Sequence, residues 1–236
     1  AIGSDDPALD AEVIALADEG YKALGLRQYS LKLTSLGCAV CRPPYRLLLQ
    51  RFLAGLDLDE ATQKRAELNP LRVLDDKRSE VQSQLGDAPL QANHLCADCE
   101  SHYKEVRHFL VLHGVEWVES PRMVRGLDYY TRTTFEFVSD ALDAAQNAVG
   151  GGGRYDGLAE QLGGDPTPGI GFGSGIERLL LARHAEGADN ALINRSVDCF
   201  VVDTTGDPSV AALIDELRES GLAVLRAYDA RSMKAQ

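Results

Sequence analysis

The period of the apolar positions changes several times along this chain. Apolar residues at helical spacing follow Asp6 and Pro7, which are typical start residues, and predict a first helix. A strand is expected next, at 28–33. Residues 35–108 show no clear alternation, and the pattern there predicts helices in 43–53, 61–68, 79–85 and 101–110. Strands, glycine turns and one strong helix at 176–184 follow within 109–187.

The last part of the chain predicts a β-α-β unit of a small α/β domain. A polar linker near 187–196 leads into a strand at 197–203 that is expected to be buried. A helix at 209–220, closed by Gly221, and a strand at 223–228 come next. Because the chain starts with Ala1 and stops without a closing element, we expect it to be a fragment of a longer protein.

Composition and charge narrow the classes of function. The chain has 236 residues, of which 44% are hydrophobic and 25% charged, as in ordinary globular domains. It lacks the apolar run of about 20 residues that a membrane span needs and opens without a signal sequence, so we expect a cytoplasmic protein with no membrane partner. A net charge of −12 argues against indiscriminate nucleic-acid binding. Residues 42–107 carry ten basic and eleven acidic side chains and would repel a polyanion least.

The segment 124–137, V-R-G-L-D-Y-Y-T-R-T-T-F-E-F, crowds charged and phenolic side chains after a glycine. If the segment is a strand, its two faces differ strongly in character. We expect the first face to line a polar pocket and the second to pack, unless the segment is simply a half-exposed strand. The first face comprises Asp128, Tyr130, Arg132, Thr134 and Glu136, and the second comprises Tyr129, Thr131, Thr133, Phe135 and Phe137.

Two glycine patterns suggest close approach of a ligand to the backbone. Four consecutive glycines at 150–153 would permit positive φ, and Arg154, Tyr155 and Asp156 then offer a cation, a ring and an acceptor; a flexible surface turn is the alternative. Glycines at 169, 171, 173 and 175 would strip one face of a strand for a flat ring, while Ile170, Phe172 and Ile176 pack the other. Arg178, at a helix start, would meet a phosphate.

Four of the five cysteines occur as two C-x-x-C pairs, Cys38 with Cys41 and Cys96 with Cys99. Such pairs favour a four-thiolate zinc site over disulfides, although their separation exceeds that of a zinc ribbon. If residues 42–95 form an inserted domain, both pairs would lie where the chain leaves and re-enters its host. The alternative is four thiols without a metal. His94 and His102 are expected on helix surfaces.

Three motifs in order resemble histidyl-tRNA synthetase, a class II aminoacyl-tRNA synthetase. They are R-G-L-D-Y-Y-T at 125–131, G-G-G-R-Y-D at 151–156 and G-F-G-S-G-I-E-R at 171–178. The first two resemble histidine-specific motifs, and the third resembles motif 3 of all class II enzymes. The resemblance implies an α+β fold: an antiparallel-sheet catalytic core with a helical insertion domain, then the start of an α/β anticodon-binding domain. The implied domains are 1–34 and 109–190 for the core, 35–108 for the insertion and 196–236 for the truncated anticodon domain.

The resemblance also implies an activity and its residues. The enzyme would activate histidine with ATP and Mg²⁺ to histidyl-adenylate and transfer it to tRNA(His), working as a homodimer at full length. Arg125 would be the catalytic arginine between the histidine carboxylate and the α-phosphate of ATP, with Asp128 orienting its neighbours. Histidine would contact Tyr129, Tyr130, Gly153 and Tyr155, and ATP would contact Arg125, Gly173, Gly175 and Arg178.

Departures from the family pattern set two further expectations. The chain lacks motifs 1 and 2, so we expect it to form adenylate poorly by itself. A synthetase-like regulatory subunit of ATP phosphoribosyltransferase is an alternative, but that paralogue usually loses the histidine motifs and the anticodon domain. Here Arg125, Tyr129, Tyr130 and Arg178 are intact. A zinc-stapled nucleic-acid module within 35–108 is a third hypothesis, which the near-neutral charge there disfavours.

Overall fold

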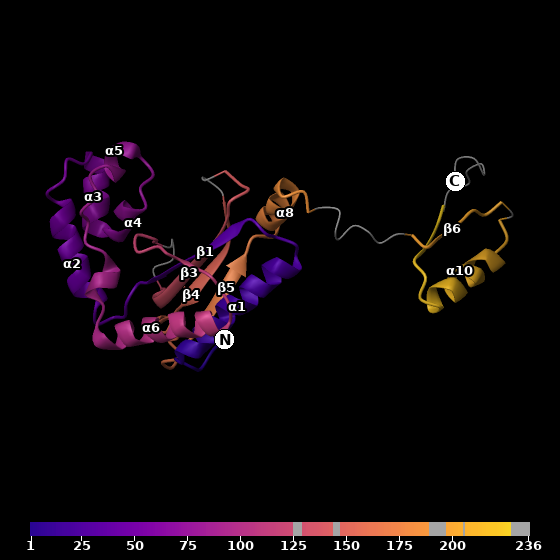
Figure 1. The fold of residues 1–236 in the computed structure, drawn as a ribbon, viewed down its shortest axis with the longest axis horizontal. Coiled ribbons are helices and arrows are strands. Elements are labelled where there is room, and N and C mark those ends of the chain that lie inside the picture. Colours follow the sequence, from indigo (N-terminus) through magenta and orange to yellow (C-terminus); the bar gives the residue numbers. More distant parts are fainter. Residues whose placement is uncertain (125–128, 144–146, 189–196, 205, 228–236) are drawn as a thin grey trace. The chain divides into compact units, whose positions relative to one another are not determined.

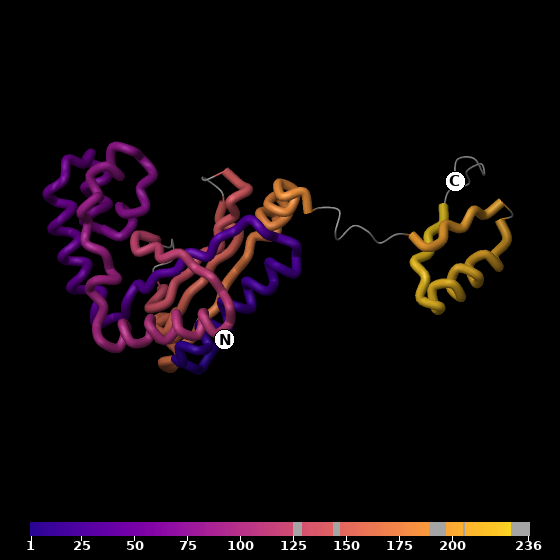
Figure 2. Tube along the Cα trace, in the orientation of Figure 1, coloured from indigo at the N-terminus to yellow at the C-terminus, as the bar shows by residue number. Residues whose placement is uncertain are grey.

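The structure is a computed structural model that describes residues 1–124, 129–143, 147–188, 197–204 and 206–227. The chain divides into two compact units, Ala1–Glu186 and Gly187–Gln236. Figures 1 and 2 show the first unit as a central sheet accompanied by helices, and the second as a small unit of strand and helix.

A five-stranded sheet with the strand order β2-β1-β3-β4-β5 forms the centre of the first unit. Neighbouring strands are antiparallel except for β1 and β2, which are parallel. The predicted α+β class with an antiparallel sheet is therefore confirmed. The strands are β1 (Tyr29–Ser35), β2 (Val118–Glu119), β3 (Thr131–Ser139), β4 (Ala148–Arg154) and β5 (Ile170–Ser174).

Helices α1 (Pro7–Ala23) and α6 (Ala97–Leu112) pack against each other and cover one face of this sheet (Figure 1). Asp6 caps α1 as predicted, since its carboxylate accepts a hydrogen bond from the backbone N–H of Ala8 at 2.9 Å. Burying one large apolar side chain in such a core contributes about 1.5–3 kcal/mol. The core includes Ile14, Leu31, Leu33, Val106, Leu110, Phe135 and Phe137.

The opposite face of the sheet carries the alternate positions of each strand. Two rows of paired residues cross it from β1 to β5, and in both rows the positions on β4 and β5 are glycines. The two strands therefore place no side chains of their own on this half of the face, so another ring can lie against the backbone. One row is Lys32, Glu136, Gly151 and Gly173, and the other is Thr34, Thr134, Gly153 and Gly171.

A second hydrophobic core lies among short helices between β1 and α6. The helices predicted at 43–53 and 61–68 are confirmed, whereas the one predicted at 79–85 ends at Gln82. The elements are α2 (Arg42–Leu53), α3 (Glu60–Leu68), α4 (Leu71–Leu74), α5 (Ser79–Gln82) and the 3₁₀ turn η1 (Gln91–His94). Their shared core includes Tyr45, Leu49, Leu53, Val73, Val81 and Leu85.

The first unit also contains α7 (Leu158–Gln161) and α8 (Ile176–Ala185). Helix α8 confirms the strong helix predicted there, and Leu179 and Ala182 anchor it in the first core. Among the described residues, none of the helices is both long and apolar enough to span a bilayer.

The four glycines at 150–153 do not form a turn, contrary to one expectation. They lie inside β4, and none of them has a positive φ. The reason is close packing, because a Cβ at Gly152 would stand 2.1 Å from the carbonyl oxygen of Gly171 on the next strand. These glycines bring two backbones together instead of bending one.

Two other details of the sheet differ from expectation. Strand β3 starts only at Thr131, where a bulge shifts the register and Arg132 adopts φ +47°. Thr134, expected on a pocket floor, is fully buried. Of the residues expected to pack opposite the glycine stripe, Ile170 is buried but Phe172 and Ile176 are 39% and 70% exposed. Ile176 is exposed because the strand has ended and α8 begins there.

The second unit confirms the predicted β-α-β order with parallel strands. It contains β6 (Cys199–Val201), α10 (Ser209–Glu219) and β7 (Val224–Arg226), and Cys199 pairs with Val224. The prediction of a buried first strand is wrong, since Phe200 is 45% exposed. The strand is exposed because α10, the one helix described in this unit, can cover only one face of the two strands. Of the linker predicted near 187–196, residues 189–196 lie outside the described residues.

Candidate functional site

Three of the predicted histidine contacts are aromatic, and the structure brings them together. The rings of Tyr129 and Tyr130 lie 4.9 Å apart, and those of Tyr129 and Tyr155 lie 6.3 Å apart in a T-shaped arrangement. The fourth, Gly153, lies beneath Tyr130, because a Cβ there would stand 2.9 Å from Cδ1 of that ring. Residues about 25 positions apart in the chain thus form one aromatic cluster over bare backbone.

Tyr155 occupies part of the glycine-stripped strand. A Cβ at Gly169 would stand 2.5 Å from Cε2 of Tyr155, and a Cβ at Gly171 would stand 3.4 Å from the hydroxyl. At Gly169 and Gly171, the flat ring that lies against the glycine-stripped segment is therefore that of Tyr155 and not that of a ligand. Further along, Gly173 is open, since no described atom lies within 4 Å of a Cβ placed there.

A hollow of about 530 Å³ lies against the same face of the sheet. Arg178, in the first turn of α8, lines it, and its Nη1 donates to the carbonyl oxygen of Ala148 at 2.9 Å. Gly175 is the N-cap of α8 and sits beneath the Arg178 side chain. Its other walls carry side chains of both charges, including Lys32, Glu136, Asp75, Asp76, Lys77 and Arg122.

Arg125, the predicted catalytic arginine, and Asp128, predicted to orient its neighbours, lie outside the described residues. The hydroxyl of Thr134, which was expected on the floor of a polar pocket, lies buried beside the aromatic cluster. Thr134 is fully buried and its hydroxyl has no hydrogen-bond partner among the described residues. It stands next to Gly153, whose Cβ would be 3.0 Å away. A buried polar atom of this kind gains from a ligand that satisfies it.

Arg154, expected to offer a cation to a ligand, points instead into the helix-covered face. It is fully buried, and its Nη2 and Nε donate to Asp10 Oδ1 at 2.5 and 3.0 Å. His102 Nε2 lies 2.9 Å from Asp10 Oδ2, so His102 is buried and not on a helix surface. Burial by itself raises the pKa of Asp10, but the hydrogen bonds with His102 and Arg154 hold that pKa below its usual value.

This buried network also fixes the position of Tyr155. Arg154 Nη1 donates to Asp156 Oδ1 at 3.0 Å, and the same oxygen accepts from the Gly169 N–H at 3.3 Å. The Tyr155 N–H in turn donates to the Gly169 carbonyl oxygen at 2.8 Å. Within the R-Y-D motif, Arg154 and Asp156 therefore fix the backbone that positions the Tyr155 ring.

The sequence reasoning assigned no role to Asp10 and wrongly placed His102 on a helix surface, although helical spacing pointed to a buried position for both. His102 is in register with Cys99, Tyr103, Val106 and Leu110 on the buried side of α6. Asp10 likewise shares the buried side of α1 with Ile14 and Tyr21. A titratable residue on the apolar face of a helix is expected to be buried with a partner, so its position in the helical pattern could have predicted this network.

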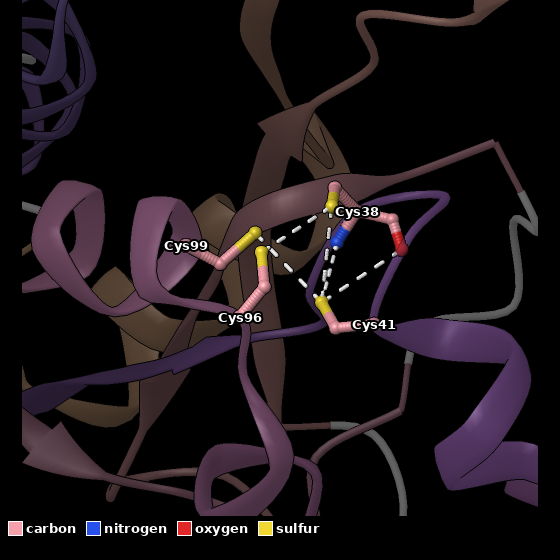
Figure 3. Close-up of side chains that lie close together, drawn as sticks. All are labelled: Cys38, Cys41, Cys96 and Cys99. Atoms are coloured by element: carbon pink, nitrogen blue, oxygen red, sulfur yellow. Dashed lines mark hydrogen bonds between the residues drawn. The ribbon is translucent and has the colours of Figure 1, made fainter.

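The two C-x-x-C pairs meet, as the insertion argument anticipated. All four sulfur atoms lie within 4.8 Å of one another (Figure 3). Cys38 Sγ is 3.8 Å from Cys41 Sγ and 3.7 Å from Cys96 Sγ, and Cys41 Sγ is 3.8 Å from Cys99 Sγ. These are non-bonded distances, far longer than the roughly 2.05 Å of a disulfide.

The environment of the four thiols favours a thiolate among them. The backbone N–H groups of Cys38 and Val40 donate to sulfur at 3.1 and 3.4 Å. Burial by itself raises the pKa of Cys38, yet backbone and thiol hydrogen bonds bring it down to about 7. Burial and the neighbouring thiols raise the pKa of Cys99. Four thiols this close ionise together only around a cation.

Comparison with known families and proteins agrees with the motifs. A family model described as Histidyl-tRNA synthetase matches residues 46–179. The chain is 54% identical to the histidine--tRNA ligase of Saccharopolyspora erythraea over 99% of its own length, and 56% identical to that of Rhodococcus erythropolis over 99%. It spans 56% and 55% of the length of these two relatives, which is little more than half.

Solved structures show the same likeness. The apo histidyl-tRNA synthetase of S. aureus is 34% identical with a TM-score of 0.77, and the match covers 100% of this chain and 59% of that one. A protein from Bacillus halodurans, described as an ATP phosphoribosyltransferase regulatory subunit/histidyl-tRNA synthetase, is 20% identical with a TM-score of 0.60 over 99% of this chain and 64% of that one. That second likeness shows the fold alone, so the regulatory alternative has less support than the ligase names of the closer relatives. This chain belongs to the histidyl-tRNA synthetase family.

Proposed function

We propose that this chain carries active-site residues of a histidine–tRNA ligase. That enzyme joins histidine to the AMP part of ATP, releasing pyrophosphate, and then passes the histidyl group to the terminal ribose of tRNA(His), releasing AMP. The observation that carries the proposal is the convergence of Tyr129, Tyr130 and Tyr155 over Gly153, next to a strand whose Gly173 is open.

The aromatic cluster would bind the amino acid. Tyr130 is buried and lies against Gly153, so its phenol would face one side of a bound imidazole or amino group. Tyr129 and Tyr155 would complete the walls, and the buried Thr134 hydroxyl would gain a partner. A site that hydrogen-bonds a polar side chain rejects apolar analogues strongly, because its own buried groups would be left unpaired.

The glycine-bare half of the face would hold the nucleotide. Gly173 and Gly175 would let adenine contact the backbone, and the exposed guanidinium of Arg178 would meet phosphate. Mg²⁺ would accompany the ATP phosphates. Arg125 would stabilise the charge that develops as the histidine carboxylate attacks the α-phosphate in line.

Further parts of the proposal follow from the family. Residues 1–34 and 109–190 would belong to the catalytic core, 35–108 to the helical insertion and 196–236 to the anticodon-binding domain. The full-length enzyme would act as a homodimer in the cytoplasm. Zn²⁺ would be an additional, structural metal held by Cys38, Cys41, Cys96 and Cys99, whose sulfur spacing supports it.

Gly173→Val tests the nucleotide half of the site in the full-length protein. No described atom lies within 4 Å of a Cβ at Gly173, so the variant folds, but its side chain occupies the strand face where adenine would lie. We expect the KM for ATP in histidine-dependent pyrophosphate exchange to rise at least tenfold, and the KM for histidine to stay unchanged. Tyr130→Ala is expected to show the reverse pattern.

Gly20→Val is the matched control, since Gly20 also has open space around its Cβ and is exposed on α1, which covers the opposite face of the sheet. It is expected to leave both constants unchanged. If the unmodified protein shows no histidine-dependent exchange, the proposal is wrong. If Gly173→Val and Gly20→Val had equal effects, the nucleotide would not bind on this face of the sheet.

A further inference from the structure

The spacing of the four sulfur atoms matches the edges of a metal tetrahedron. With Zn–S bonds of about 2.3 Å, the edges of a tetrahedral four-thiolate site are about 3.8 Å long. Three of the S···S distances in the cluster are 3.7, 3.8 and 3.8 Å, and all four sulfur atoms lie within 4.8 Å of one another. Cys41 and Cys99 are buried and the other two are half-buried, as in a closed structural site.

The cluster joins a helix that packs in the first core to a short connection between two elements. Cys96 is the N-cap of α6, and Cys99 lies in the first turn of that helix, which packs along α1. Cys38 and Cys41 lie in the short connection between β1 and α2. An ion bound to all four would therefore clamp this connection onto a helix that is already held by the first core.

The connection between β1 and α2 is hydrogen-bonded to Arg132, just after the aromatic motif. The Leu36 N–H donates to the Arg132 carbonyl oxygen at 2.8 Å, and the Arg132 N–H donates to the Gly37 carbonyl oxygen at 2.9 Å. Arg132 adopts φ +47°, a conformation that residues other than glycine adopt only when their surroundings hold them there.

A second link runs from the residue that follows Cys41. Arg42 Nη1 donates to the carbonyl oxygen of Tyr130 at 2.7 Å. The backbone on either side of Thr131 is therefore held from both sides by the connection that carries two of the thiols. These hydrogen bonds couple the position of the Tyr130 ring over Gly153 to the position of the connection between β1 and α2.

We propose that a zinc ion bound by Cys38, Cys41, Cys96 and Cys99 positions the Tyr130–Arg132 backbone, and with it the Tyr130 ring of the amino-acid pocket. The role of that ring rests on the proposed function, whereas the metal and its mechanical link do not. The cysteines are positioning residues in this scheme, and they touch no substrate.

The test combines metal analysis with hydrogen exchange on the full chain, purified under reducing conditions. We expect one zinc per chain by elemental analysis. Removal of zinc with a chelator, or the double substitution Cys96→Ser/Cys99→Ser, is expected to speed amide exchange at least tenfold in peptides covering 36–42 and 129–133. Exchange in the middle of α1 and in α10 is expected to stay unchanged.

Arg42→Gln and Arg46→Gln form a matched pair that separates metal binding from positioning. Both arginines are on α2 and donate to a backbone carbonyl oxygen. Arg46 Nη2, however, donates to Leu68 at 2.6 Å, at the exposed C-terminal end of α3 and away from the aromatic motif. Both variants are expected to keep the zinc. Only Arg42→Gln is expected to speed exchange in 129–133.

Three results would overturn the proposal: a chain without zinc, zinc loss that leaves exchange in 129–133 unchanged, or exchange that rises equally everywhere because the whole unit unfolds. None of these readouts needs histidine or ATP. Failure of the pyrophosphate-exchange assay would therefore remove the substrate role of Tyr130 but leave the metal link standing.

Discussion

Arg154 and Asp10 form a fully buried ion pair in which Nε and Nη2 of the arginine both donate to the carboxylate, at distances of 2.5 to 3.1 Å. The pair joins β4 to α1, and His102 joins α6 to the same carboxylate. One charge pair therefore connects the three elements that fix the helix-covered side of the sheet.

Asp10→Asn is expected to destabilise the first unit strongly. The substitution leaves the buried Arg154 guanidinium with only the half-buried Asp156 as a counter-charge. Breaking a buried pair by removing one partner costs about 3–5 kcal/mol. The free energy of unfolding from urea titration measures the effect. Glu12→Gln removes an exposed acid from the same helix and is expected to change stability by less than about 0.5 kcal/mol. Equal values for both variants would contradict the structural importance of the pair.

The same carboxylate predicts a dependence of stability on pH. The pKa of Asp10 is lower in the folded chain than its usual value, because the hydrogen bonds with His102 and Arg154 outweigh the effect of burial. The ionised form therefore contributes stability that is fully present above the unfolded pKa of about 4 and is lost as pH falls through the lower, folded pKa. The stability gap between the unmodified chain and Asp10→Asn should shrink as pH drops below about 4. A gap that stays constant down to pH 2 would contradict this assignment.

Gly152→Ala is expected to disrupt the pairing of β4 with β5. Its Cβ would stand 2.1 Å from the Gly171 carbonyl oxygen and 2.7 Å from the Phe172 Cα, which are backbone atoms that cannot rotate away. Overpacking of this kind costs about 1–3 kcal/mol. Gly173→Ala, on the neighbouring strand with open space around its Cβ, serves as the control. Thermal unfolding should separate the two variants, and equal melting temperatures would argue against the close approach.

Gly37→Ala is expected to disturb the thiol cluster. Gly37 and Gly114 both have φ +67°, so replacing either by Ala costs about 1–2 kcal/mol of backbone strain. A Cβ at Gly37 would also stand 2.5 Å from Cys41 Sγ, whereas one at Gly114 meets no described atom within 4 Å. Titration of native thiols should show faster reaction in Gly37→Ala than in Gly114→Ala. If both variants react alike, sulfur crowding at Gly37 is unimportant.

Helices and strands were predictable here because their signals are local. The caps and apolar spacing of α1, α2, α3 and α8 lie within each segment, so the sequence indicated them almost in full. The four glycines of β4 were misinterpreted for the opposite reason. Glycine permits both a turn and a close approach of two strands, and only the neighbouring Gly171 backbone distinguishes them.

The candidate site was partly predictable in the same sense. Spacing within the three motifs identified Tyr130, Gly153, Tyr155 and Arg178, which the structure places on one face of one sheet. It also suggested a ligand role for Arg154, whose side chain points to the other face. Adjacent residues of a strand point in opposite directions, and the partner of Arg154 lies far away in sequence at Asp10.

By itself, the sequence determined the family, most of the helices and the residue types available for chemistry, because motif spacing and helical periodicity are properties of short segments. Only the tertiary structure decided which of those residues meet. It joined Asp10, His102 and Arg154 away from water, brought Cys38 and Cys41 to Cys96 and Cys99, and separated the ring of Tyr155 from the charge of Arg154. Such contacts form between distant parts of the chain, and burial selects them because a charge or thiol removed from water needs a partner at once.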